Sequence, residues 1–229
     1  EICACLVGSE MCIRDRQYTV SGKAFVGTGI TSVKIPASVK EIVSTDPTKT
    51  SATLYGAFTD MPALESVEFA ANSVMTVISA GAFRDNDYLN KVVLPAGIQT
   101  IGDSAFYSAG EKTDKEFNVT FTAKEDGTYA LKTIGNFAFG YAVNLKSISL
   151  PDGLTSIGNS AFFKTALTSV TIPYTVTTIG TSAFAGVADG RSELTEVTFN
   201  VGENGKSKLQ AIKAGAFKNS RIVNVVFPE

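Results

Sequence analysis

The chain contains no histidine, and its three cysteines all lie within the first twelve residues. Histidine is the usual general base near neutral pH, and a cysteine thiolate is a common nucleophile and zinc ligand. The pair Cys3 and Cys5 is too closely spaced for a typical zinc site. We therefore expect no catalytic residues, no metal site and no bound cofactor.

Charge is also scarce, because Asp, Glu, Lys and Arg make up only 18% of the 229 residues and the formal net charge is −2. A protein that binds nucleic acid or an anionic membrane surface needs a basic patch, which this composition does not supply. The longest apolar runs are far too short for a membrane-spanning helix. The sequence predicts no nucleic-acid partner and no membrane span.

The dipeptide Ala-Phe, in contrast, recurs at regular intervals. Its phenylalanines are separated by 33, 25, 23, 33, 23, 22 and 33 residues, a period of 22–25 with about ten more residues in three intervals. A fixed period of this length marks a solenoid, and one aromatic ring per coil suits an interior stack. We interpret as core, and not as a ligand-binding ladder, the residues Phe25, Phe58, Phe83, Phe106, Phe139, Phe162, Phe184 and Phe217.

Each coil also contains a short run in which apolar and polar residues alternate, as they do in a half-buried strand. The clearest run contains Leu167, Val170 and Ile172 and ends at Pro173. A second apolar pair, such as Val176 and Ile179, is expected to turn the chain, and the glycine after it indicates positive φ or a close backbone approach. Equivalent strands, eight in all, are expected from Ile30, Leu64, Leu89, Phe117, Leu145, Leu194 and Ile222.

These patterns predict a mainly β repeat solenoid, a right-handed superhelix of about eight 22–25-residue coils with a parallel sheet. Two of the insertions contain Asp126-Gly127 and Asn204-Gly205, which are strong hairpin signals, so each is expected to project as a β-hairpin from one edge of the sheet. The third insertion, Ser44–Thr53, is expected to be a polar loop.

The two ends of the chain differ from the repeats. Residues 1–16 break the composition of the rest and resemble translated sequencing-adapter sequence, so we interpret them as a non-native leader and residues 17–229 as the solenoid. The leader lacks the basic start of a signal peptide. The chain begins and ends within a repeat and shows no polar caps, so we expect a solenoid truncated at both ends.

The unit L-x-x-V-x-I-P-x-x-V-x-x-I-G-x-x-A-F is similar to the BspA-like leucine-rich repeat, most clearly over Leu145–Phe184. The resemblance covers about residues 20–228 and departs from the common leucine-rich pattern by placing proline after the strand. Family members are mostly secreted or surface-anchored bacterial proteins, many from Bacteroidales, and some are adhesins that bind host matrix proteins or other bacteria. The resemblance implies an extracellular or cell-surface, monomeric protein that binds a protein or glycan partner, with no catalytic residues to carry over.

Residues between the buried strand positions are expected to point outward in columns that a partner can contact. This face is mainly small and polar, with few of the large anchors found in binding hot spots, so a plain solvated face remains an alternative. The insertions are the other candidates, although they are equally well explained as tolerated loops. The candidate partner-binding residues are Lys34, Glu68, Lys91, Thr120, Asp126, Tyr129, Ser149, Thr171, Glu196, Thr198, Asn204 and Lys206.

Three functions follow from this reading. A surface or secreted binding module is favoured. A structural spacer that holds another domain away from a cell surface is the alternative. A carbohydrate-active β-solenoid enzyme is the third, and the Ser- and Thr-rich face argues against it. The acidic segment Asp85-Asn86-Asp87 lacks the spacing of a calcium loop and is interpreted as a solvated loop.

Overall fold

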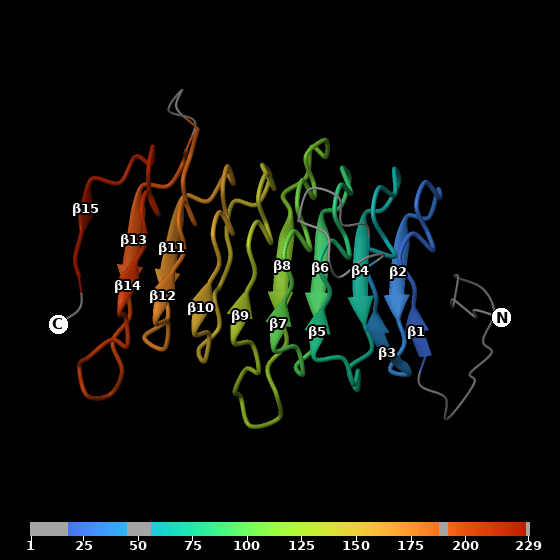
Figure 1. Cartoon of the computed structure of the whole chain (residues 1–229), viewed down its shortest axis with the longest axis horizontal. Helices are drawn as coiled ribbons and strands as arrows, with labels where there is room; N and C mark the ends of the chain where they lie inside the picture. The colour runs from blue at the N-terminus through green and yellow to red at the C-terminus, as the bar shows by residue number, and fades with distance from the viewer. Residues whose placement is uncertain (1–17, 45–55, 188–191, 228–229) are drawn as a thin grey trace.

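The computed structural model describes residues 18–44, 56–187 and 192–227. Every regular element in these ranges is a strand, and the strands pair in parallel to build one elongated stack of coils (Figure 1). The predicted leader, residues 1–16, and nearly all of the predicted polar loop at 44–53 lie outside the described residues. The handedness of the superhelix and the number of complete coils stay predictions.

Most of the predicted alternating runs form strands along one side of the stack. They make two parallel sheets, in the orders β2-β4-β6-β8 and β11-β13-β15. Val67, Val92 and Val170 point into the core from their strands, while the residues on either side of each are more exposed. The strands are β2 (Ser32–Ile35), β4 (Ser66–Phe69), β6 (Lys91–Leu94), β8 (Asn118–Phe121), β11 (Ser169–Ile172), β13 (Glu196–Phe199) and β15 (Asn224–Val225).

The strand predicted at Leu145–Leu150 is absent, so this prediction was wrong. Ile148 and Leu150 still pack partly buried against the core, and Ser149 between them is exposed. The segment pairs with neither β8 nor β11, which leaves the two sheets separate. Apolar alternation thus records which side chains face inward, but it does not guarantee a regular ladder: the Thr168 N–H still donates to the Lys146 carbonyl at 3.4 Å without a strand forming.

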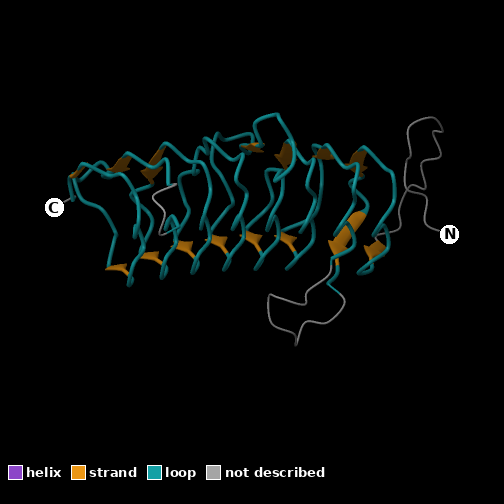
Figure 2. Ribbon diagram, turned by 90° about the horizontal axis from the view of Figure 1, so that it is seen from above, coloured by secondary structure: helices purple, strands orange, loops and turns teal. Residues whose placement is uncertain are grey.

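A further parallel sheet of two-residue strands forms where the second apolar pair of each coil ends, instead of a simple turn. Figure 2 shows its short strands on the side of the stack opposite the longer ones. Two residues are too few to show alternation in the sequence, which is why the turn prediction missed this sheet. The sheet contains β5 (Val77–Ile78), β7 (Thr100–Ile101), β9 (Thr133–Ile134), β10 (Ser156–Ile157), β12 (Thr178–Ile179) and β14 (Ala211–Ile212), and β3 (Val39–Ile42) pairs with β1 (Tyr18–Val20) beside it.

The Ala-Phe turns close each coil and confirm the predicted core stack. Consecutive rings from Phe25 to Phe217 stack with centroids 5.0–5.4 Å apart and interplanar angles of 1–8°. The backbone repeats as regularly, since the Phe106 N–H donates to the Ala138 carbonyl at 2.7 Å and the Phe139 N–H to the Ala161 carbonyl at 2.8 Å. The turn is therefore a third hydrogen-bonded ladder along the stack.

The repeated glycine marks a close approach of backbones, the second of its two predicted explanations. A Cβ on Gly158 would lie 2.5 Å from the carbonyl carbon of Gly135, and one on Gly180 would lie 2.4 Å from that of Gly158. Neither residue has positive φ. At these two positions a side chain would push adjacent coils apart, whereas Ser79 and Lys213 hold the equivalent position in two other coils.

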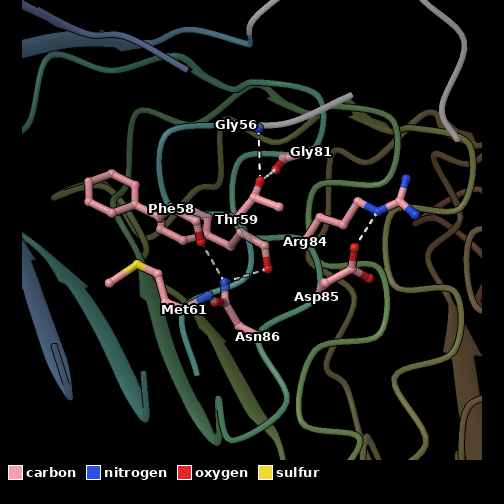
Figure 3. Close-up of polar contacts among 9 residues, drawn as sticks. Gly56, Phe58, Thr59, Met61, Gly81, Arg84, Asp85 and Asn86 are labelled. Carbon is pink, nitrogen blue, oxygen red and sulfur yellow. Dashed lines mark hydrogen bonds and ion pairs between the residues drawn. The ribbon is translucent and has the colours of Figure 1, made fainter. Parts of the chain in front are cut away.

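Buried polar side chains fix the first of the coils after residue 56 (Figure 3). The Asn86 amide donates to the Phe58 and Phe83 carbonyls at 2.7 and 2.8 Å, and its oxygen accepts the Met61 N–H at 2.9 Å. Because Asn86 is 0% exposed, the interpretation of this segment as a solvated loop was wrong at its central residue. Its acidic neighbours point elsewhere, Asp85 to Arg84 and Asp87 to Lys112.

Candidate binding surface

The longer strands present the predicted outward columns. In one column Lys34 pairs with Glu68, Val93 with Thr120, and Thr171 with Thr198. In the other column Ser66 pairs with Lys91, and Glu196 lies between Ser169 and Asn224. We call the outward side of these strands the strand face. Its register agrees with the sequence prediction wherever the strands pair, and Ser149 alone among the strand candidates lies in the gap between the two sheets.

The strand face carries its charge mainly in the N-terminal sheet. The Lys91 Nζ lies 2.5 Å from the Glu68 Oε1, and this hydrogen bond together with the lysine's charge lowers the pKa of Glu68 below its ordinary value. The C-terminal sheet instead exposes hydroxyl groups at Thr171 and Thr198, with Glu196 as its charged strand candidate. The two sheets therefore offer chemically different surfaces, one with paired charges and one with hydroxyl groups.

The two described insertions project from the same long edge of the stack, directly after β8 and β13, as the green-yellow and orange-red loops of Figure 1 show. In the first loop the Lys124 N–H donates to the Thr128 carbonyl at 2.8 Å. Asp126 accepts from the Thr128 hydroxyl at 2.6 Å and from its N–H at 2.9 Å, and these bonds lower the pKa of Asp126. Tyr129 follows, half-buried.

The second loop has the same closure. The Gly202 N–H donates to the Lys206 carbonyl at 2.9 Å, and the Lys206 N–H donates to the Asn204 Oδ1 at 3.1 Å. Neither loop contains a second, antiparallel strand in its described residues, so the β-hairpins themselves are not confirmed. The candidates Asp126, Asn204 and Lys206 are exposed and border the strand face at the carboxyl ends of its strands.

A surface cluster that the sequence analysis missed lies on the outside of the Ala-Phe turns. Tyr107 and Tyr141 have ring centroids 5.2 Å apart, Tyr141 and Phe163 are 5.4 Å apart, and Phe137 lies 6.3 Å from Tyr107. All four side chains are partly exposed. We call these four residues the aromatic ridge. Neighbouring rings are tilted by 46–64°, unlike the flat stack inside the coils.

Two cations pack on the aromatic ridge. The Arg84 guanidinium lies 4.8 Å from the Tyr107 ring centroid, and the Lys164 Nζ lies 4.9 Å from that of Tyr141. Such cation–π contacts are attractive and place each cation over one face of its ring. Burial, and then the neighbouring Tyr141, raise the pKa of Tyr107, so its hydroxyl remains a neutral donor.

A polar ladder runs beside the aromatic ridge. The Asp103 Oδ1 accepts the Asn136 N–H at 2.7 Å, the Asn136 Oδ1 accepts the Asn159 N–H at 2.8 Å, and the Asn159 Oδ1 accepts the Thr181 N–H at 2.9 Å. These residues follow the glycine positions of successive coils. The stack thus carries a row of hydrogen-bonded polar side chains as well as the row of aromatic rings.

The sequence held a signal for the aromatic ridge that periodic analysis does not use. Tyr107 and Phe163 directly follow the repeated Phe, and Tyr141 follows it by two residues, in three successive coils. Aromatic residues that do not recur in every coil mark this cluster in the sequence. A consensus of the repeat does not contain them, because each is present in only some coils.

Neither a metal centre nor a membrane-crossing element emerges from the described ranges. No three His, Cys, Asp or Glu side chains there gather closely enough to hold an ion. None of the segments described there forms a helix of the length and hydrophobicity required to cross a bilayer.

Comparison with known proteins places the chain in a family. The model of the BspA type leucine-rich repeat region matches residues 5–130 and 118–229. A crystal structure of a leucine rich cell surface protein from Faecalibacterium prausnitzii is 28% identical with a TM-score of 0.58, over 79% of this chain and 42% of that one. The chain therefore spans less than half of that relative.

A leucine-rich repeat protein from Bacteroides ovatus aligns with 15% identity and a TM-score of 0.23, over 86% of this chain and 75% of that one. No curated protein matches the chain. The family match covers most of the sequence and agrees with the stacked parallel strands. The chain belongs to the family of BspA-type leucine-rich repeat proteins.

Proposed function

We propose that this chain is a non-enzymatic binding module of a bacterial cell surface, which presents the strand face to a protein partner and acts as a monomer. The observation that carries the proposal is the register of the strand face. Outward side chains such as Thr171 and Thr198 stand opposite one another on hydrogen-bonded strands about 4.8 Å apart. They form straight rows that contribute nothing to the core.

A rigid scaffold makes such rows suitable for recognition. The side chains beneath them, including Val170 and Ile172, are almost fully buried, so the strands cannot move independently of the core. A partner then meets a preordered surface, and little conformational freedom is lost on binding. The leucine rich cell surface protein of Faecalibacterium prausnitzii supports a location at the cell surface, since it shares this repeat architecture.

The loops border this face and extend the proposed surface. Tyr129 supplies an aromatic group at one loop and Lys206 a cation at the other. Replacing either residue by alanine should lower the affinity for the partner without unfolding the chain, because neither residue belongs to the core cluster.

The test is a surface plasmon resonance screen of the full chain against immobilised matrix proteins, fibronectin and fibrinogen first. The variant T171E/T198E places two carboxylates on the strand face and should abolish saturable binding. Gln99→Glu is the matched control, since Gln99 is exposed next to β7 on the opposite sheet. Absence of any saturable partner would favour the structural spacer. Binding that T171E/T198E leaves intact would exclude the strand face.

A further inference from the structure

We propose that the aromatic ridge binds an extended acidic glycan, which lies along the axis of the stack with successive sugars on Tyr107, Tyr141 and Phe163. This site is separate from the strand face, and nothing in its argument depends on a protein partner. Four features of the ridge support the proposal: the choice of residues, the backbone conformation, the spacing of the rings and the charge.

The fold does not require aromatic residues at these places. The position directly after the repeated Phe holds Tyr107 and Phe163 in two coils, but Thr59 and Ala185 in others. All of these coils stack equally well, as the regular Phe ladder shows. The aromatic residues are therefore an addition to the repeat and not part of it.

Two of the ridge residues also oppose local backbone preference. Phe137 has φ of 52° and Tyr141 has φ of 62°, the left-handed region that bulky side chains disfavour. Ser104 and Ser160 occupy the position of Phe137 in adjacent coils, and Ser108 occupies that of Tyr141. Positive φ recurs at these two turn positions along the stack, so the conformation belongs to the fold, and the choice of a bulky aromatic residue there does not. An aromatic side chain kept on the surface at a strained position indicates selection for its ring.

The spacing of the rings favours a chain of sugars over a chain of amino acids. Neighbouring ring centroids on the ridge are 5.2 and 5.4 Å apart, close to the length of one hexose in an extended glycan. An extended peptide advances by about 6.6 Å for every two residues and so falls out of step after one repeat. The apolar face of a pyranose ring packs well on an aromatic ring.

The cation over Tyr141 favours a carboxylate on the glycan at that ring. The acids near the ridge lie toward Tyr107: Asp85 pairs with Arg84 at 2.8 Å, and Glu111 is exposed and helps to raise the pKa of Tyr107. Lys164 lies over Tyr141 and forms an ion pair with no carboxylate in the part of the chain that the structure describes. A uronic acid next to the Tyr141 subsite would complement this cation.

The experiment is isothermal titration calorimetry of the full chain with β-1,4-linked hexamannuronate. We expect saturable binding that weakens about tenfold in Tyr141→Ser and in Tyr107→Thr, the loss that corresponds to ~1.4 kcal/mol. Both replacements copy residues that the same positions hold in other coils, Ser108 and Thr59, so the fold is retained. Tyr88→Ser is the control, since Tyr88 is 44% exposed and lies off the ridge, and it should bind as the unaltered chain does.

Charge is tested with cellohexaose, a neutral glycan of similar length, which should bind more weakly than hexamannuronate. Lys164→Gln should reduce the difference between the two. Equal affinity for both sugars overturns the acidic preference, and equal affinity for a hexaglutamate peptide overturns the choice of a glycan.

If the ridge variants bind hexamannuronate as the unaltered chain does, the glycan does not bind at the ridge. If no saturable binding occurs, the proposal is overturned. Should Tyr107→Thr lower the melting temperature, Phe163→Thr replaces it as the test. The variant T171E/T198E separates the two proposals: it should leave hexamannuronate binding unchanged, and a loss there would move the glycan to the strand face.

Discussion

Two rows of aromatic rings run along this molecule, one inside the Ala-Phe turns and one outside them. The inner rings continue from Phe25 to Phe217 with interplanar angles of at most 8°. The outer rings occupy only the coils between Phe106 and Phe163 and tilt by 46–64°. The inner row repeats because every coil needs it. The outer row does not repeat, so the coil does not require its residues.

Adjacent residues test this difference most directly. Phe162 is 1% exposed within the inner stack, whereas Phe163 lies on the aromatic ridge. Phe162→Ala should lower the free energy of unfolding by roughly 3–5 kcal/mol, as truncation of a buried Phe does. Phe163→Ala should lower it by about 1 kcal/mol or less, because the ring is partly exposed and leaves no closed cavity. Urea denaturation followed by circular dichroism measures both.

Similar losses for Phe162→Ala and Phe163→Ala would erase the distinction between the rows. In that case the aromatic ridge is part of the core, and its residues need no ligand to explain them.

Asn86 and Asp85 form a second adjacent pair, one inside and one outside. Asn86→Ala leaves the Met61 N–H and the carbonyls of Phe58 and Phe83 without their side-chain partner in a buried site, which should cost about 3 kcal/mol. Asp85→Asn removes a partly exposed ion pair with Arg84 and should cost at most ~1 kcal/mol. Asparagine also tolerates the positive φ of this position. An equal decrease of the melting temperature in both variants would contradict the conclusion that the buried Asn86 stabilises this coil.

Glycines test the same contrast in the backbone. Gly158→Ala should cost roughly 1–3 kcal/mol, because its Cβ would lie 2.5 Å from the Gly135 carbonyl carbon and the coils would have to move apart. Gly29→Ala has no atom within 4 Å of the new Cβ and no positive φ, so it should be neutral or slightly stabilising. The melting temperatures of the two variants check this, and a stable Gly158→Ala would show that the coils are less closely stacked at that corner.

The repeated features of the fold could be predicted from the sequence because each coil solves the same packing problem. The Phe stack, the register of the strand face and the close approach at Gly158 and Gly180 all follow from residues that recur. The sheet of two-residue strands, β5 to β14, could not be predicted, since two residues are too few to show an alternation of apolar and polar side chains. The missing strand at Leu145–Leu150 could not be predicted either, because its apolar pattern is intact.

The candidate site divides in the same way. The columns of the strand face could be predicted, as could the turns at Asp126 and Asn204, which turn-forming residues specify locally. For the aromatic ridge, the sequence shows that Tyr107, Tyr141 and Phe163 depart from the repeat, but only the stacking of coils brings them together. Residues that depart from a repeat need a three-dimensional register before they can be seen as a group.

The smallest expected effect concerns Glu68, on the outer surface beside Lys91. Its pKa in the folded chain is lowered below the ordinary value of 4.5, chiefly by the hydrogen bond to Lys91, so the ion pair stabilises the fold above that value and is lost as the pH falls through the lowered pKa. Because both side chains are about half exposed, the contribution should be at most ~0.5 kcal/mol. Glu68→Gln should therefore be slightly less stable than the unaltered chain at neutral pH and equal to it at acid pH.

Glu196→Gln is the control, since Glu196 pairs in register with the uncharged Ser169 and Asn224. Urea unfolding at both pH values measures this difference, and high salt should reduce it. A decrease of more than ~1 kcal/mol in the free energy of unfolding of Glu68→Gln at neutral pH would contradict the prediction. In that case an exposed ion pair would contribute to stability as much as a buried residue does.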